Sequence, residues 1–113
     1  MKINSTINLG GYTATVTIYI DYIRIFFKDE IDCVLFSDKF NGSIVIDNKK
    51  FNIYYYDNEN MVDIVITNGT EDDFKYVVNT VKDYLKYNNC VNSDKFELDT
   101  IDGCTYLTIH SSK

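Results

Sequence analysis

The chain of 113 residues has little of what catalytic and membrane proteins usually carry. It contains one histidine, His110, no proline or tryptophan, and three widely spaced cysteines that form no C-x-x-C pair. No stretch approaches the roughly 18 apolar residues of a membrane-spanning helix, and residues 1–6 show no apolar run of the signal-peptide type. We therefore expect a cytoplasmic protein with reduced thiols and no membrane association.

Positive charge is also scarce. The sequence has 11 Lys and Arg against 17 Asp and Glu, which gives a formal net charge of -6. Nucleic acids and anionic membranes attract clustered lysines and arginines, so this balance argues against direct binding to either. It leaves room for a basic protein as partner. The length predicts a single domain over residues 1–113, and we expect a monomer or a weak dimer.

Signals for catalysis are weak. His110 would need a nucleophile and an orienting acid brought to it, and its neighbours suggest an exposed, inert side chain near the C-terminus. The segment Asp57–Asn60 resembles a calcium loop, but Met61 stands where an oxygen ligand is needed. Glu97 and Asp99 have no apolar pocket evident around them that would prepare them for acid–base work. We predict no enzymatic activity, no cofactor and no metal site.

The sequence is rich in alternating apolar and polar residues, which is typical of strands with one buried face. Folding these strands around tight turns brings inward residues opposite inward residues, and a slip of one residue would break each match. The predicted hairpins turn at residues 10–11, 48–49, 57–60 and 102–103, and they pair Leu9 with Tyr12, Ile46 with Phe51, Ile44 with Ile53, Ile53 with Ile64, and Leu98 with Leu107.

Two other segments complete the expected fold. The run 12–27 changes phase at Asp21, which predicts a bulge or sharp bend near residues 20–22. A turn at residues 28–30 then predicts a strand that places Cys33 opposite Ile25 and Leu35 opposite Ile23.

One helix is predicted, over about residues 71–88, because Thr70 is a good N-cap and apolar residues recur at helical spacing after it. The expected fold is α+β: a mostly antiparallel, strongly curved β-meander sheet with this one amphipathic helix packed on it and a C-terminal β-hairpin. The apolar face of residues 44–66 should share its core with Phe74, Val78, Val81 and Leu85.

Tyrosines beside acidic residues, outside the expected core, are the clearest functional signal. Such surfaces are typical of sites that bind a basic protein, although plain surface or a second packing layer is the alternative. The candidate contact residues are Glu97, Asp99 and Tyr106 on the outer face of the last hairpin with Asp102 at its tip, and Tyr76, Asp83 and Tyr87 along the helix. A third tyrosine face carries Tyr54 and Tyr56. We prefer the hairpin, because three lysines dilute the charge around the helix stripe.

In general character, the chain resembles the small acidic antagonists that bacteria and phages make, such as toxin immunity proteins and phage inhibitors of host nucleases, although it shares no motif with them. The resemblance implies a protein that blocks a basic, nucleic-acid-processing partner by occupying its surface. Two alternatives stay open. One is a small-ligand-binding domain with a cavity between sheet and helix, and the other is an enzyme without a readable motif.

Overall fold

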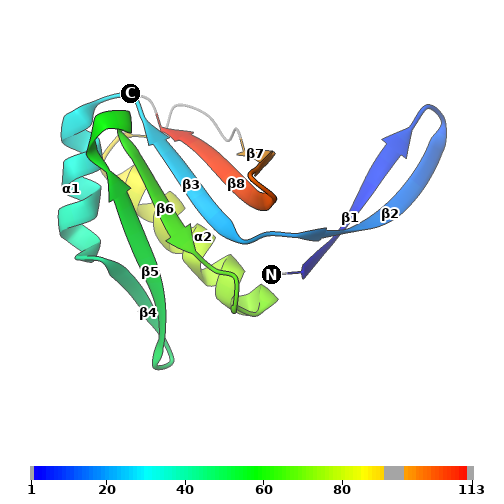
Figure 1. Cartoon of the computed structure of the whole chain (residues 1–113), viewed down its shortest axis with the longest axis horizontal. Helices are drawn as coiled ribbons and strands as arrows, with labels where there is room; N and C mark the ends of the chain where they lie inside the picture. Colours follow the sequence, from blue (N-terminus) through cyan, green and yellow to red (C-terminus); the bar gives the residue numbers. More distant parts are fainter. Residues whose placement is uncertain (1, 91–95, 112–113) are drawn as a thin grey trace.

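The computed structural model describes residues 2–90 and 96–111, which form two β-sheets and two α-helices (Figure 1). Two strands, β1 (Lys2–Leu9) and β2 (Tyr12–Tyr19), form a hairpin that is a sheet of its own and projects from the rest. The six-stranded sheet contains β3 (Tyr22–Phe27), β4 (Ser43–Ile46), β5 (Lys49–Tyr56), β6 (Met61–Val65), β7 (Phe96–Ile101) and β8 (Cys104–Ser111). The helices are α1 (Glu30–Phe40) and α2 (Glu71–Tyr87), and a 3-10 turn η1 (Asp57–Glu59) joins β5 to β6.

The strand order of the larger sheet is β4-β5-β6-β3-β8-β7. Neighbouring strands are antiparallel except for β3 and β8, which run parallel, so the sheet is mixed. The α+β class predicted from the sequence is confirmed in this broad form. The parallel pair was not anticipated, because its strands are far apart in the chain and no local turn specifies their register.

The prediction of a strand after residue 30 is wrong, because residues 30–40 form the helix α1. Cys33 and Leu35 therefore do not pair with β3. Asp29 precedes the helix with an extended backbone and makes no side-chain capping hydrogen bond to the described residues, and Asn41 ends the helix with a φ of 46°. Cys33 and Phe36 are buried at helical spacing, while Ile31 and Leu35 on the other side are exposed. Apolar residues on both sides of the helix imitate the alternation of a strand, which explains the error.

The turn predicted at residues 48–49 is also displaced. It occupies Asp47 and Asn48, which both have positive φ angles (46° and 68°). Ile44 therefore lies opposite Phe51 rather than Ile53. This shift of two residues leaves every side chain on its predicted face, because side chains alternate with period two.

The other predicted hairpins are confirmed. Their registers around residues 10–11, 57–60 and 102–103 are those expected. The bend predicted near residues 20–22 is found as the break between β2 and β3, where the chain leaves one sheet and enters the other.

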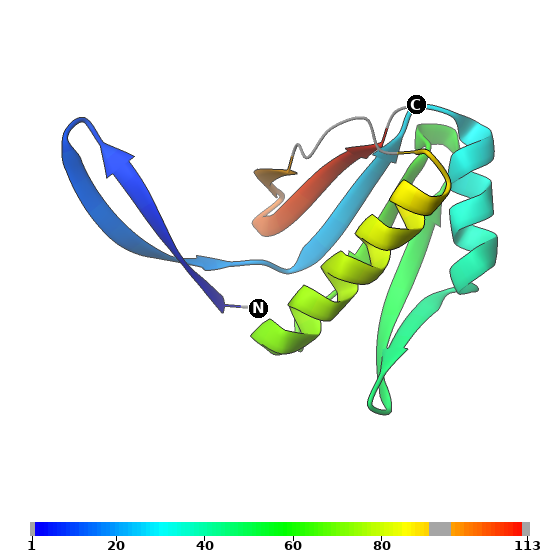
Figure 2. The ribbon, with the colours of Figure 1, turned by 180° about the vertical axis from the view of Figure 1, so that it is seen from behind.

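Both helices cover the same face of the six-stranded sheet (Figure 2), and the core lies between the helices and that face. The fully buried side chains of Val77, Val81 and Leu85 on α2 meet strand residues such as Ile23 and Ile64, whose exposure is zero. The helix stripe and the strand face thus share a core, as the sequence predicts. Neither helix of the two described ranges has the length and hydrophobicity to cross a membrane.

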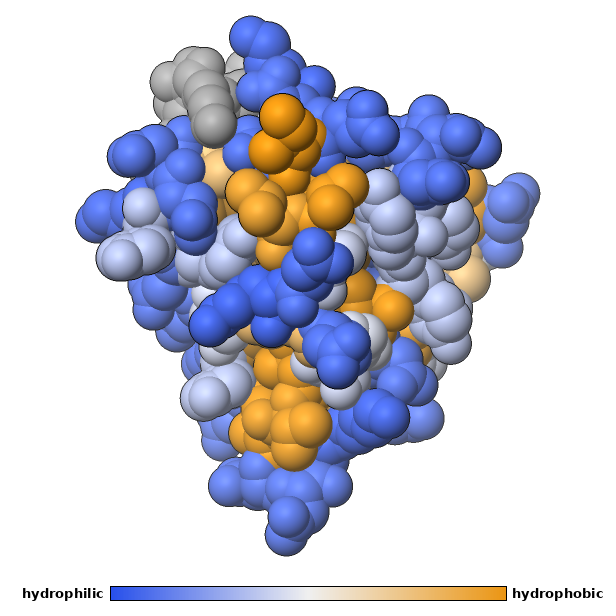
Figure 3. Space-filling view, turned by 90° about the vertical axis from the view of Figure 1, so that its left-hand side faces the viewer, coloured by the Kyte–Doolittle hydropathy of each residue, from blue (hydrophilic) through white to orange (hydrophobic). Residues whose placement is uncertain are grey.

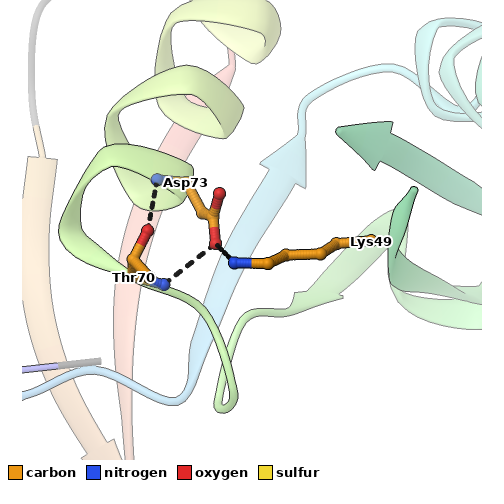
Figure 4. A network of polar contacts seen from close by, with 3 residues as sticks. All are labelled: Lys49, Thr70 and Asp73. Carbon is orange, nitrogen blue, oxygen red and sulfur yellow. Dashed lines mark hydrogen bonds and ion pairs between the residues drawn. The ribbon is translucent and has the colours of Figure 1, made fainter. Parts of the chain in front are cut away.

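The start of α2 is fixed by a capping box. The Asp73 N–H donates to the Thr70 hydroxyl, and the Thr70 N–H donates to the Asp73 carboxylate (Figure 4). Lys49 Nζ lies 2.9 Å from the same carboxylate. The Thr70 N–H and the Lys49 ammonium hold the pKa of Asp73 below its ordinary value. This network links the start of α2 to β5.

Candidate functional site

The face of the six-stranded sheet opposite the helices carries no other described element, and it is turned toward the viewer in Figure 1. We call it the outer face. Direct cross-strand partners on this face run from β5 to β7 in one continuous row. The row consists of Tyr54, Asp63, Arg24, Thr108 and Glu97.

Aromatic side chains lie on either side of this row. Tyr22 and Tyr106 are stacked with ring centroids 5.0 Å apart. Phe26 and His110 are stacked at 5.4 Å. Directly paired aromatic residues on neighbouring strands stabilise a sheet and hold each other in place. The outer face is therefore a rigid aromatic platform.

The centre of the platform is an ion pair. Arg24 Nε lies 2.7 Å from Asp63 Oδ1, and Arg24 Nη2 lies 2.8 Å from Oδ2, so the contact is bidentate. The two side chains are only 11% and 4% exposed. Asp63 raises the pKa of Arg24 by hydrogen bonding, and the guanidinium lies 4.0 Å from the ring centroid of Tyr106. The Arg24 side chain is thus held in one geometry by contacts within the chain.

One hydroxyl of this face is unsatisfied. Thr108 is 1% exposed, and its Oγ1 has no hydrogen-bond partner in the part of the chain that the structure describes. Its strand neighbours in the row are Arg24 and Glu97. Buried hydroxyls are normally hydrogen-bonded, and leaving one unpaired costs stability. The Thr108 hydroxyl is therefore a buried polar group, unpaired among the described residues, at the centre of the outer face and covered by its neighbours.

The structure brings two predicted surfaces together. Glu97, Asp99 and Tyr106 of the last hairpin lie on the same face as Tyr54 and Tyr56 of β5. They belong to one face because β8 pairs with β3, which places the last hairpin in the same sheet as β5.

The tyrosines of the outer face differ in how exposed they are to solvent. Tyr106 is 9% exposed, because it lies against Tyr22 and Arg24, and burial raises its pKa. Tyr54 and Tyr56 are 51% and 42% exposed and project from the platform. Tyr106 therefore supports the face, and Tyr54 and Tyr56 are available for contact.

The acidic residues lie at the β7 end. Glu97 and Asp102 are exposed and Asp99 is half-buried, with Asp102 in the turn at the hairpin tip. Glu97 Oε2 lies 3.5 Å from His110 Nε2. The platform thus has a strongly acidic edge.

The helix stripe lies elsewhere. Tyr76, Asp83 and Tyr87 are exposed on α2, with Tyr87 87% exposed, and they point away from the core. Because α2 covers the inner face of the sheet, this stripe and the outer face lie on opposite sides of the molecule (Figure 2). The two candidate surfaces are therefore separate sites.

The contribution of β3 was missed by sequence reasoning. Tyr22, Arg24 and Phe26 alternate with the buried Ile23 and Ile25. An arginine in an otherwise apolar strand was the available signal. Its role depends on Asp63, which lies directly opposite it on the neighbouring strand β6.

Two apolar features lie outside this platform. A groove of about 350 Å³ lies between the base of the β1–β2 hairpin, α2 and the last hairpin. It is lined mostly by apolar side chains, including Ile18 and Val78, and Lys82 stands at it with Nζ 4.5 Å from the Phe96 ring centroid. Ile31 and Leu35 of α1 are 72% and 52% exposed, and Figure 3 shows hydrophobic side chains on this side of the molecule.

A metal site and a reactive thiol each have requirements with which the described residues can be compared. No group of three His, Cys, Asp or Glu residues in the described ranges is arranged to hold a metal ion. Cys33 and Cys90 are buried, and Cys104 is half-buried. Burial raises the pKa of the Cys33 thiol to about 11, so this group is protonated and inert at neutral pH.

The sequence matches no protein-family model, no curated protein and no solved structure. The functional assignment therefore rests on the surface of this chain alone.

Proposed function

We propose that this chain is a small acidic antagonist that binds a basic, nucleic-acid-processing protein through its outer face. The observation that carries the proposal is a sheet face, uncovered by any described element, on which the exposed Tyr54 and Tyr56 of β5 lie beside a fixed Arg24–Asp63 pair. Tyrosine and arginine are the residues most enriched where protein interfaces are tightest.

The platform suits a protein partner because its side chains are already held in place. Stacking and the bidentate ion pair restrict the rotamers of Tyr22, Arg24 and Tyr106 before binding. Side chains that are ordered in advance lose less conformational entropy on association. The extent of the face, across five neighbouring strands, matches a broad contact surface better than a small-molecule site.

The charge of the chain indicates the sign of the partner. Glu97, Asp99 and Asp102 give the platform an acidic edge in a chain of net charge -6. Proteins that hold nucleic acid are basic where they hold it, so an acidic competitor is steered to that surface. Blocking the surface requires no chemistry from the inhibitor.

The proposal is tested by capture with matched variants. The immobilised wild-type chain and a Tyr54→Ala/Tyr56→Ala variant are exposed to the same cell extract, with Tyr76→Ala/Tyr87→Ala on the helix stripe as control. We expect the wild type and the helix variant to retain the same basic protein and the β5 variant to lose it.

The captured protein then decides the mechanism. Its activity on nucleic acid should fall when the wild-type chain is added, and association should slow as salt rises. Retention of the same partner by the β5 variant, or its loss only in the helix variant, would contradict the proposal.

The groove supports a second candidate function. An apolar groove of about 350 Å³ with one cationic side chain, Lys82, suits a small apolar carboxylate. Decanoate should shift the NMR signals of Val78 and Leu98, and Val78→Phe should abolish the effect by filling the groove. Absence of any shift with decanoate at millimolar concentration would remove this candidate.

A further inference from the structure

The β1–β2 hairpin, residues 2–19, projects from an acidic molecule and carries a single charged residue, Lys2 at its base. Residues 3–20 contain no charged side chain and form the longest uncharged stretch of the sequence, although 25% of all residues are charged. We call residues 2–19 the arm. It extends away from the six-stranded sheet in both ribbon views (Figures 1 and 2).

The arm has one apolar and one polar face. Ala14, Val16 and Ile18 alternate with Thr13, Thr15 and Thr17, and the threonines are exposed while the apolar residues are half-buried. At the base, Ile3 and Ile18 pack against the core. Beyond the base, β1 and β2 have extensive contacts only with each other among the described elements.

Such a hairpin needs a covering layer. An isolated two-stranded sheet is marginally stable in water, and stability requires a third strand or a packed surface. Exposed strand edges are usually protected by lysines, prolines or bulges. After Lys2 the arm has no lysine or proline, and its register continues without interruption from Lys2–Tyr19 to Leu9–Tyr12.

We propose that the apolar face of the arm packs against the same face of a second copy of this chain. The distribution of charge favours a second copy as the binding partner of the arm. Two copies of net charge -6 repel each other, so they associate most readily through uncharged surface. Because the arm projects, two copies that meet arm to arm keep their acidic sheets apart. A charged partner would gain no electrostatic attraction from the arm.

The dimensions of the arm set the expected strength. Eight residues per strand at about 3.4 Å each, and two strands with their side chains, give a face of at most roughly 27 Å by 10 Å, and its base packs on the core through Ile3 and Ile18. Such a face is smaller than the roughly 800 Å² that each partner buries in a standard stable interface. We therefore expect a weak, symmetric dimer. The outer face stays free in this arrangement, so the dimer does not depend on the proposed function.

Sedimentation equilibrium of the full chain tests the proposal, from about 10 µM to about 1 mM. The two variants are Val16→Lys on the apolar face and Thr15→Lys, the neighbouring residue on the polar face. Both add one lysine to the same strand. We expect the wild type and Thr15→Lys to dimerise with similar Kd, and Val16→Lys to raise Kd by more than about tenfold. A wild type that is monomeric throughout, or two variants with the same Kd, would overturn the proposal.

A mixing experiment shows whether a Val16 variant fails to dimerise because the interface is lost or because the arm is misfolded. Val16→Lys and Val16→Glu should each be monomeric, and an equal mixture should dimerise because opposite charges meet across the interface. Raised salt should strengthen the wild-type dimer by screening the repulsion between acidic copies. Failure of the mixture to dimerise, or a wild-type dimer that weakens with salt, would count against arm-to-arm packing.

Discussion

Replacing Arg24 by Met tests whether the ion pair holds the outer face together. The substitution keeps a long apolar side chain but leaves the Asp63 carboxylate, whose side chain is 4% exposed, without its bidentate partner. Removing one member of a buried pair costs roughly 3–5 kcal/mol. Because the face is open to water on one side, we expect the lower end of this range, about 3 kcal/mol.

Urea denaturation followed by circular dichroism measures the effect as a change in the free energy of unfolding. The double variant Arg24→Met/Asp63→Leu should recover most of the loss, since no uncompensated charge remains. Lys50→Met, which removes an exposed lysine from the same face of β5, should change stability by less than about 0.5 kcal/mol. A loss below about 1 kcal/mol in Arg24→Met, or a double variant no more stable than the single one, would refute the reasoning.

Three further predictions concern the core, the helix cap and the thiols. In the same denaturation experiment Ile64→Ala should cost about 3–4 kcal/mol and Ile53→Ala about 1–2, because Ile64 is fully buried and Ile53 only partly; equal costs would contradict the packing. Since the pKa of Asp73 is lowered in the folded chain, its stabilisation is present above its ordinary value of 3.8 and is lost as pH falls through the lowered pKa. The stability advantage of the wild type over Asp73→Asn should therefore shrink below about pH 4, and an advantage that grows with acidity would argue against the network. In a thiol titration without reductant, Cys104 should react first in the folded chain and all three cysteines after denaturation, whereas rapid reaction of Cys33 would be incompatible with its buried, protonated state.

Local signals were sufficient for much of the fold. The hairpins at residues 10–11 and 102–103 follow from two-residue turns and alternating side chains, and the start of α2 follows from the Thr70 capping box. These features depend on neighbours in the sequence, so the sequence alone predicts them well.

Two local features, the helix α1 and the exact position of the turn between β4 and β5, were not predicted correctly. In α1, the apolar Ile31 and Leu35 fit the alternation of a strand, and packing of Phe36 against Phe27 and Tyr84 favours the helix. The turn at Asp47 and Asn48 competes with an equally plausible turn one residue later, and backbone preference for positive φ decides between them.

The candidate site was predicted in pieces. Alternation placed the hairpin acids and the Tyr54–Tyr56 pair on outward faces, but only the parallel pairing of β3 with β8 shows that these faces are one. The same long-range pairing places Arg24 between Asp63 and Thr108. Contacts between strands this far apart in sequence leave no local pattern from which to predict them.

The most direct test of the central claim is an NMR titration of the ¹⁵N-labelled chain with its captured basic partner. If the outer face binds, the largest chemical-shift changes will map to the outward positions of β5, β6, β3 and β8, with Tyr54, Tyr56 and Arg24 among them. Changes concentrated instead at Tyr76 and Tyr87 of α2, with the outer face unperturbed, would contradict the account.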